Sequence, residues 1–278
     1  MSKLAHIPPS DKERLGKLVR ELARRKEREK AQTDFLAFVK AVWPDFIYGR
    51  HHARIAAEFE RVARGECKRL IINLGPRHTK SEFGSYLLPA WFLGRFPHKK
   101  VIQCSHTADL AVGFGRKVRN LVDSPAYQEV FPNVGLRSDS KAAGRWNTSA
   151  GGDYFAIGVG GAVTGKGADL LIIDDPHSEQ EAAIAASNPE IYDKVYEWYT
   201  SGPRQRLQPG GSIIIIQTRW SKRDLTGQVL DAAAQRGNEN WRVVEFPAIL
   251  PSGKPLWPEF WSLEELESTR EAIDVSKW

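Results

Sequence analysis

The segment that most constrains the fold of this chain is residues 70–82, LIINLGPRHTKSE. Its apolar start predicts a short buried strand, and Gly75 and Pro76 predict a tight turn directly after the strand. Lys80 and Ser81 then open a predicted helix. A chain that passes from a strand through a tight turn into a helix N-terminus presents backbone N–H groups to an anion. The segment therefore predicts a phosphate-binding loop, although a Lys-Ser pair after a strand taken alone would equally fit an ordinary surface loop.

In phosphate-binding loops of the pattern G-x-x-x-x-G-K-[ST], the lysine reaches the β- and γ-phosphates and the hydroxyl reaches Mg²⁺. This chain has Leu74 at the first glycine position and Thr79 at the second. If the second position requires a positive φ, Thr79 adds strain and weakens nucleotide binding, and otherwise Thr79 adopts helical backbone angles. The residues expected to bind ATP are Gly75, Pro76, Arg77, His78, Thr79, Lys80 and Ser81, with Ser81 also a ligand of Mg²⁺.

A second segment, residues 170–175 (LLIIDD), supports the nucleotide hypothesis. Its four aliphatic residues predict a strand buried on both faces, as in a parallel sheet, whose carboxyl end lies at the edge where open α/β folds bind ligands. We expect Asp174 to hold Mg²⁺ through water and Asp175 to orient or deprotonate the attacking water. Glu179 is the next candidate for the base. An Asp-Asp-Pro turn with an Asx cap is the simpler alternative.

Composition describes an ordinary globular chain of 278 residues, with 41% hydrophobic and 27% charged residues. No apolar run approaches the roughly 20 residues that a membrane-spanning helix needs, so we expect no membrane association and a cytoplasmic protein. Cys67 and Cys104 are too few and too scattered for a disulfide framework or a zinc site. The net charge of +6 permits a polyanionic partner but equally fits a solvated basic surface.

Alternating helical and strand signals predict an α/β fold with a mainly parallel sheet covered by helices on both faces. The predicted helices cover about residues 10–32 (starting at a capping box from Ser10), 34–42, 52–64, 81–93, 108–123, 124–131, 191–200 and a stretch after Asp224. The predicted strands cover about residues 70–74, 101–105, 154–159, 169–173, 212–217 and 241–246, with a loop or hairpin over 133–152.

The first helix carries an apolar stripe in its first half, and its second half, residues 24–30 (RRKEREK), is charged on every side. This charged half is either a solvated helix end or a basic arm that contacts DNA or a neighbouring subunit. We expect three parts: an N-terminal helical arm (1–32), a nucleotide-binding domain (33–250) and a C-terminal segment (251–278).

These motifs resemble the large subunit of tailed-bacteriophage terminases, the motor that packages DNA into procapsids, over nearly the whole chain. The resembling segments are RLIINLGPRHTKSE, PAWFLGRFP, VIQCSHTADLA, GGAVTGKGADLLIIDDPHSEQEA and IIIIQTRWSKRDLTG. The resemblance implies a P-loop NTPase fold of the additional-strand, catalytic-carboxylate type, with an N-terminal helical subdomain. It places the 212–217 strand between the phosphate-loop strand and the acidic strand, so that Gln217 and Thr218 emerge beside the γ-phosphate and couple hydrolysis to movement.

The resemblance also implies roles for basic residues. Arg77 falls where the family carries an arginine that grips γ-phosphate oxygens, and pairing with Glu82 or with solvent is its simpler alternative. Lys166, in a glycine-flanked loop expected near the sheet's carboxyl edge, falls where relatives offer a positive charge across a subunit boundary. Arg204 and Arg206 are rivals for that role. His51 and His52 lie where such motors often recognise adenine, or else serve the N-terminal helices.

The implied function is ATP-driven translocation of double-stranded DNA, with ATP and Mg²⁺ as cofactors, in the cytoplasm of an infected or lysogenic bacterium. The implied partners are the portal or procapsid, the small terminase subunit and further copies in a ring, although the chain alone could be monomeric. A nuclease half is expected to follow residues 262–278 and to be absent from this chain. The alternatives are a helicase-like translocase and a non-catalytic, nucleotide-gated assembly protein.

Overall fold

The computed structural model describes residues 9–185, 187–237 and 240–272, and they form an α/β fold around one sheet. The strands of this sheet are β1 (Arg69–Leu74), β2 (Lys100–Ser105), β3 (Leu136–Ala142), β4 (Arg145–Thr148), β5 (Asp153–Gly158), β6 (Ala168–Asp174), β7 (Leu207–Gln217) and β8 (Arg242–Phe246). The six predicted strands are confirmed, and the expected loop or hairpin over 133–152 is the hairpin of β3 and β4.

Within the described residues the spatial order of the strands is β3-β4-β5-β2-β6-β7-β1-β8. In this spatial order, every pair of neighbouring strands from β5 across to β8 is parallel. Only the β3–β4 and β4–β5 pairs are antiparallel. The parallel pairs require crossover connections, which the intervening helices provide. The expected position of the 212–217 strand is confirmed, because β7 lies between β1 and β6.

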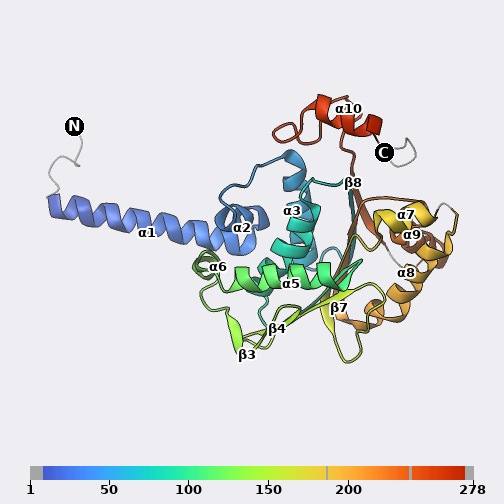
Figure 1. Ribbon diagram of the computed structural model, residues 1–278. Coiled ribbons are helices and arrows are strands. Elements are labelled where there is room, and N and C mark those ends of the chain that lie inside the picture. Colours follow the sequence, from blue (N-terminus) through green and yellow to red (C-terminus); the bar gives the residue numbers. More distant parts are fainter. Residues whose placement is uncertain (1–8, 186, 238–239, 273–278) are drawn as a thin grey trace.

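The helices cover both faces of the sheet (Figure 1). They are α1 (Pro9–Thr33), α2 (Phe35–Val42), α3 (Arg50–Ala63), η2 (Glu82–Leu87), α4 (Leu88–Arg95), α5 (Ala108–Val122), α6 (Pro125–Val130), α7 (Glu179–Ala185), α8 (Glu190–Ser201), η3 (Pro203–Arg206), α9 (Leu225–Arg236) and α10 (Leu263–Ala272). Helices α2 to α6 pack an aromatic-rich core against one face, and α8 and α9 pack a smaller core against the other. Because β1, β6 and β7 are buried on both faces, their aliphatic runs are continuous rather than alternating.

The N-terminal helix differs from the sequence expectation at its start. Helix α1 begins at Pro9, so Ser10 lies inside the helix and not at the expected cap; the fixed φ of proline suits a first helical position. Its last turn docks on the domain, since Trp91 Nε1 donates to the carbonyl of Ala31 at 3.0 Å. The first half projects away from the domain (Figure 1). Its apolar stripe is therefore exposed: Leu15, Leu18, Val19 and Leu22.

None of the helices in the described ranges combines the length and the apolar character that crossing a bilayer needs.

A buried carboxylate ties the edge strand β8 to α3. Glu58 of α3 is 2% exposed, and Arg242 of β8 approaches it through Nη2 at 2.7 Å and Nε at 3.1 Å. Arg61 and Arg54 lie 3.1 and 3.5 Å from the same carboxylate. Burial acts to raise the pKa of Glu58, but the hydrogen bonds from Arg242 and the three positive charges outweigh burial and lower the pKa.

We predict that Glu58→Gln lowers the free energy of unfolding at neutral pH by about 1–3 kcal/mol, because a neutral amide leaves the guanidinium of Arg242 without its charged acceptor. A carboxyl whose folded-state pKa is depressed stabilises the fold above its unfolded pKa and loses that contribution as the pH falls through the folded pKa. The difference between variant and wild type should therefore shrink below about pH 4. Urea unfolding at pH 7 and at acidic pH measures it, with the surface variant Glu13→Gln as control. A pH-independent difference would contradict the electrostatic account.

Candidate active site

The carboxyl ends of β1, β7 and β6 meet at one point of the sheet edge. Their last residues are Leu74, Gln217 and Asp174, and the next residues bond across the strands. The backbone N–H of Asp175 donates to the carbonyl of Ile216 at 2.8 Å, and that of Thr218 donates to Asp175 Oδ1 at 2.8 Å. The hydroxyl of Thr218 donates to the carbonyl of Leu74 at 3.4 Å. Parallel register therefore brings the end of β7 beside the end of β6 and beside the end of β1, which is more than 140 positions earlier in the sequence.

The phosphate-loop lysine reaches the acidic strand end. Lys80 Nζ lies 2.9 Å from Asp175 Oδ2, and the side chains are 8% and 27% exposed. The attraction between a half-buried carboxylate and a buried ammonium group stabilises the charged form of both groups. A nucleotide phosphate at this place would compete with Asp175 for Lys80. Lys80 and Asp175, predicted from separate motifs, are thus in direct contact.

Three non-glycine residues of this site have left-handed backbone conformations: Arg77 (φ 58°), Thr79 (φ 62°) and Asp175 (φ 40°). Such conformations are uncommon, and for a β-branched residue such as Thr79 they are strained. The structure thus supports the first of the two alternatives for Thr79, in which the missing glycine imposes strain. The loop is built with strain at the positions that would face a ligand.

One hydrogen bond to α3 and one within the loop support Thr79 in this conformation. His52 Nδ1 accepts from the N–H of Gly49 at 2.8 Å, so the proton of the neutral ring is on Nε2, which lies 2.6 Å from Thr79 Oγ1. The Thr79 hydroxyl in turn donates to the carbonyl of His78 at 2.6 Å. Burial lowers the pKa of His52 to about 3 and that of His51 to about 4, and neighbouring histidines add to both shifts. These rings are neutral at physiological pH, and in this structure they support the loop.

Asp174 is 1% exposed at the end of β6. Burial and, to a smaller degree, the adjacent Asp175 raise the pKa of its carboxyl to about 7, although Lys80, Ser85 and Ser81 act to lower it. Its Oδ2 accepts from the Ser85 hydroxyl at 2.8 Å, whereas its Oδ1 has no hydrogen-bond partner. Mg²⁺ prefers oxygen ligands and is commonly held by one or two protein oxygens, water and substrate phosphates. The free, buried Oδ1 and the Ser81 hydroxyl therefore fit the expected Mg²⁺, and the described residues offer no larger cluster of metal-ligating side chains.

The other predicted residues of the loop region differ in exposure. Arg77 is exposed and forms no ion pair with any described residue, and Glu82 pairs with Lys117 at 3.8 Å, so the suggested Arg77–Glu82 pair is not formed. Gln217 is 1% exposed, and neither polar atom of its side chain has a hydrogen-bond partner.

Thr218 contacts Asp175 directly, through the hydrogen bond from its backbone N–H. Glu179, the substitute base, lies exposed in the first turn of α7.

The expected location of Lys166 is wrong. Lys166 Nζ lies 2.9 Å from Oδ2 of Asp153, the first residue of β5, so Lys166 is at the amino edge of the sheet, opposite the phosphate loop. The cause is the short connection of β5 to β6, which returns to the amino edge without a helix, so that its last residues lie beside the start of β6. The side chain is 11% exposed and also lies over the ring of Phe155.

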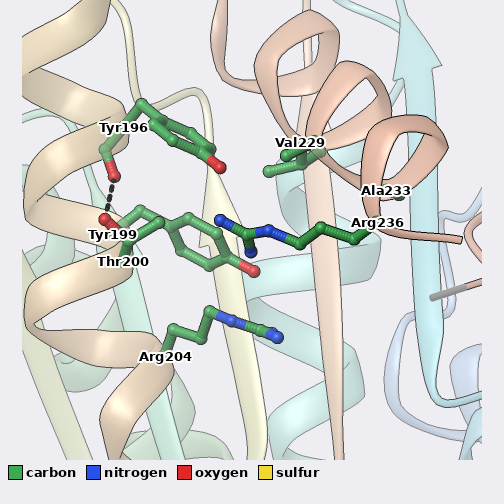
Figure 2. A pocket seen from close by; sticks show the side chains of 8 residues that line it. Tyr196, Tyr199, Thr200, Arg204, Val229, Ala233 and Arg236 are labelled. Carbon is green, nitrogen blue, oxygen red and sulfur yellow. Dashed lines mark hydrogen bonds between the residues drawn. The ribbon is translucent and has the colours of Figure 1, made fainter. Parts of the chain in front are cut away.

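The rival arginines lie close to the same edge, in η3 before β7. Arg204 points with Arg236 of α9 toward a pocket between α8 and α9 that Tyr196 and Tyr199 also line (Figure 2). Arg206 is partly buried, and its Nε has no hydrogen-bond partner. None of the three basic candidates lies at the phosphate loop of its own chain.

Two tryptophans beyond β8 reach the loop, and the sequence analysis missed them. Trp261 stacks on His78 with ring centroids 6.3 Å apart, and its Nε1 donates to the carbonyl of Arg77 at 3.5 Å. Trp257 packs edge-on against His51 and His52, at 5.4 and 5.0 Å. The C-terminal segment therefore covers the side of the loop that faces α3. Its closely spaced aromatic residues were the only available signal.

The chain has a P-loop NTPase fold of the additional-strand type. Strand β1 leads through a strained loop into a helix N-terminus that carries Lys80 and Ser81, and β7 is inserted between β1 and the acidic strand β6.

No protein-family model matches the chain. The large terminase subunit of Enterobacteria phage T3 is 23% identical over 226 residues, which are 80% of this chain and 36% of that protein. The large terminase of bacteriophage HK97 has a TM-score of 0.53 at 14% identity, covering 87% of this chain and 51% of that one.

A third similar protein is the large terminase of a thermophilic bacteriophage, solved in complex with ADP. It has a TM-score of 0.44 at 10% identity and covers 82% of this chain and 50% of that one, too low a similarity to carry an argument. The predicted resemblance is confirmed: the chain is similar to the large subunits of phage terminases. It spans 36% of the length of the curated relative and about half of the solved ones.

The strain at Thr79 gives a test of the loop conformation. Thr79→Gly and Thr79→Val both remove the hydroxyl that bonds to His52, but only glycine adopts a positive φ freely. We predict that Thr79→Gly is more stable to unfolding than Thr79→Val by about 1–2 kcal/mol, the cost of a left-handed residue with a Cβ. Parallel denaturant titrations measure the difference. Equal stabilities would show that the loop does not hold this conformation in solution.

Proposed function

We propose that this chain is the ATPase motor portion of a phage terminase large subunit, which hydrolyses ATP to drive double-stranded DNA into a procapsid. The observation that carries the proposal is the contact of Lys80 with Asp175 at the junction of β1, β7 and β6. Kinship with terminase large subunits supports the choice among the many activities of this fold. Nuclease activity is not part of the proposal for this chain.

Each residue of the proposed site would have a separate role in ATP hydrolysis. Lys80 would leave Asp175 for the β- and γ-phosphates, with the loop N–H groups around them. Asp174 and Ser81 would hold Mg²⁺, which on binding neutralises developing phosphate charge. Asp175, released from Lys80 but still bonded to the N–H of Thr218, would orient and deprotonate the attacking water. Because that N–H belongs to the residue after β7, a change at Asp175 is transmitted directly to Gln217 and Thr218, the proposed coupling pair.

The proposed partners are double-stranded DNA, the portal of the procapsid, the small terminase subunit and other copies of the chain in a ring, in the cytoplasm of the bacterial host. A helicase-like translocase would use the same site but separate DNA strands. A nucleotide-gated assembly protein would bind ATP without turnover. Single-turnover hydrolysis separates the last alternative, and strand-displacement and packaging assays separate the other two.

Lys80→Ala should lower ATP turnover on the order of 10²–10³-fold, because the phosphates lose the one lysine of the loop. Turnover of radiolabelled ATP by purified protein measures the effect. Lys117→Ala is the matched control, since it removes a nearby lysine that is exposed and paired with Glu82, and it should keep wild-type turnover. Undiminished hydrolysis by Lys80→Ala would refute the assignment of the phosphate loop.

We also propose that Lys166 completes the site of a neighbouring subunit in the ring. Its position at the amino edge supports a role outside its own site, but it would have to leave Asp153 to reach another chain. Arg204 and Arg206 remain the rivals. A positive charge supplied in this way acts on the transition state and is absent from a monomer.

Mixing subunits tests the role of Lys166. Lys166→Ala should be nearly inactive alone. Mixed with Lys80→Ala protein, which cannot hydrolyse ATP at its own site but keeps Lys166, it should recover ATP hydrolysis. Steady-state hydrolysis of mixtures against each pure variant measures the recovery. Lys99→Ala is the control, because Lys99 is another lysine at the amino edge paired with an aspartate, Asp169. Activity of pure Lys166→Ala equal to wild type would exclude the residue and leave the arginines.

A further inference from the structure

A chain of polar side chains runs through the apolar core beneath the phosphate loop. Ser85 of η2 and Gln103 and Ser105 of β2 are each 0% exposed. Ser85 Oγ lies 2.8 Å from Asp174 Oδ2, and Gln103 Nε2 lies 3.2 Å from Ser85 Oγ and 2.9 Å from Ser105 Oγ. Phe83, Leu87 and aliphatic residues of β6 and β7 belong to the hydrophobic core on this face of the sheet. Polar groups in such surroundings are costly unless they are bonded, so their arrangement requires a reason.

Two successive hydrogen bonds of this chain point toward Asp174, the first from Gln103 to Ser85 and the second from Ser85 to Asp174. The hydroxyl of Ser85 has one hydrogen, which it donates to the carboxylate. Its oxygen is then available as an acceptor for Gln103, whose Nε2 also lies within hydrogen-bond distance of Ser105 Oγ and of the carbonyl of Cys104. Donors aligned in one direction polarise one another and strengthen the final bond. The end of the chain is thus suited to an ionised carboxylate.

The helix that carries Ser85 is widened and pressed against the sheet. Residues Glu82–Leu87 form a π-helical segment between Lys80 and α4, and such segments occur frequently at functional sites. Gly84 makes the close approach possible, since a Cβ at that position would overlap the side chain of Ile216 in β7. The next residue, Ser85, is thereby brought to the end of β6.

From this geometry we propose that Ser85 and Gln103 are positioning residues that hold Asp174 by Oδ2 and leave Oδ1 free to hold Mg²⁺. The unpartnered Oδ1, in a side chain that is 1% exposed, is the second observation that points to a ligand. This inference rests on the proposed nucleotide site and names residues outside its motifs. Residues that orient a metal ligand typically change metal affinity by about 10–100-fold when they are removed.

The test is nucleotide binding measured at varied Mg²⁺ concentration with a fluorescent ATP analogue. Ser85→Ala should require about tenfold more Mg²⁺ for half-maximal binding, while affinity for the analogue in EDTA stays near wild type. Ser85→Thr, which keeps the hydroxyl, should recover most of the loss. Gln103→Leu should shift the Mg²⁺ requirement in the same direction by a smaller factor. Ser212→Ala removes another buried serine, which lies beside Leu170 near the start of β6, and is the control.

The outcomes separate positioning from packing. An unchanged Mg²⁺ requirement in Ser85→Ala would overturn the inference, as would an equal loss of binding with and without Mg²⁺ accompanied by a lower unfolding midpoint. If wild type shows Mg²⁺-dependent binding that Lys80→Ala loses, the proposed function stands whatever Ser85 does. Wild-type protein that binds no nucleotide would overturn the proposed function and this inference together.

Discussion

The parallel pairing of β7 with β1 on one side and β6 on the other is the constraint on which the site depends. Register fixes Asn73 beside Gln217 and Asp174 beside Ile216, so the three strands end at the same level. Only then does the loop after β1 place Lys80 against the residue after β6. A shift of one position would turn each side chain to the opposite face of the sheet and separate these groups. The continuous burial of aliphatic residues on both faces of these strands stabilises the register.

The opposite charges of Lys80 and Asp175 are paired within the chain at this edge of the sheet. Lys80 and Asp175 neutralise each other, while Asp174 is buried with one oxygen bonded and the other free. A bound nucleotide with Mg²⁺ would exchange both sets of partners at once. The strained φ angles at Arg77, Thr79 and Asp175 lie where this exchange would occur. Strain held by packing, here by His52 and the C-terminal tryptophans, suits a loop that adjusts to its ligand.

The two faces of the sheet supply different support. On the face of η2 and α5, a dense aromatic core encloses the polar chain from Gln103 to Asp174. On the other face, α8 and α9 cover the sheet, and His177 accepts from the N–H of Leu225 at the start of α9. The proposed coupling pair lies at the end of the strand between them. Movement of β7 against either layer of helices would therefore shift Gln217 and Thr218 relative to the phosphate loop.

The sequence by itself determined the strand-loop-helix unit, the buried acidic strand and nearly every helix and strand, because local periodicity, turn residues and caps specify these features. It did not place Lys166, since a nine-residue connection leaves open which edge of the sheet its last residues reach. It could not find Ser85, Gln103 or Trp261 as neighbours of the site, because each looks like an ordinary residue of its own helix, strand or loop. Only tertiary packing, which presses Gly84 onto Ile216 and folds the C-terminal segment back on His78, decides these contacts.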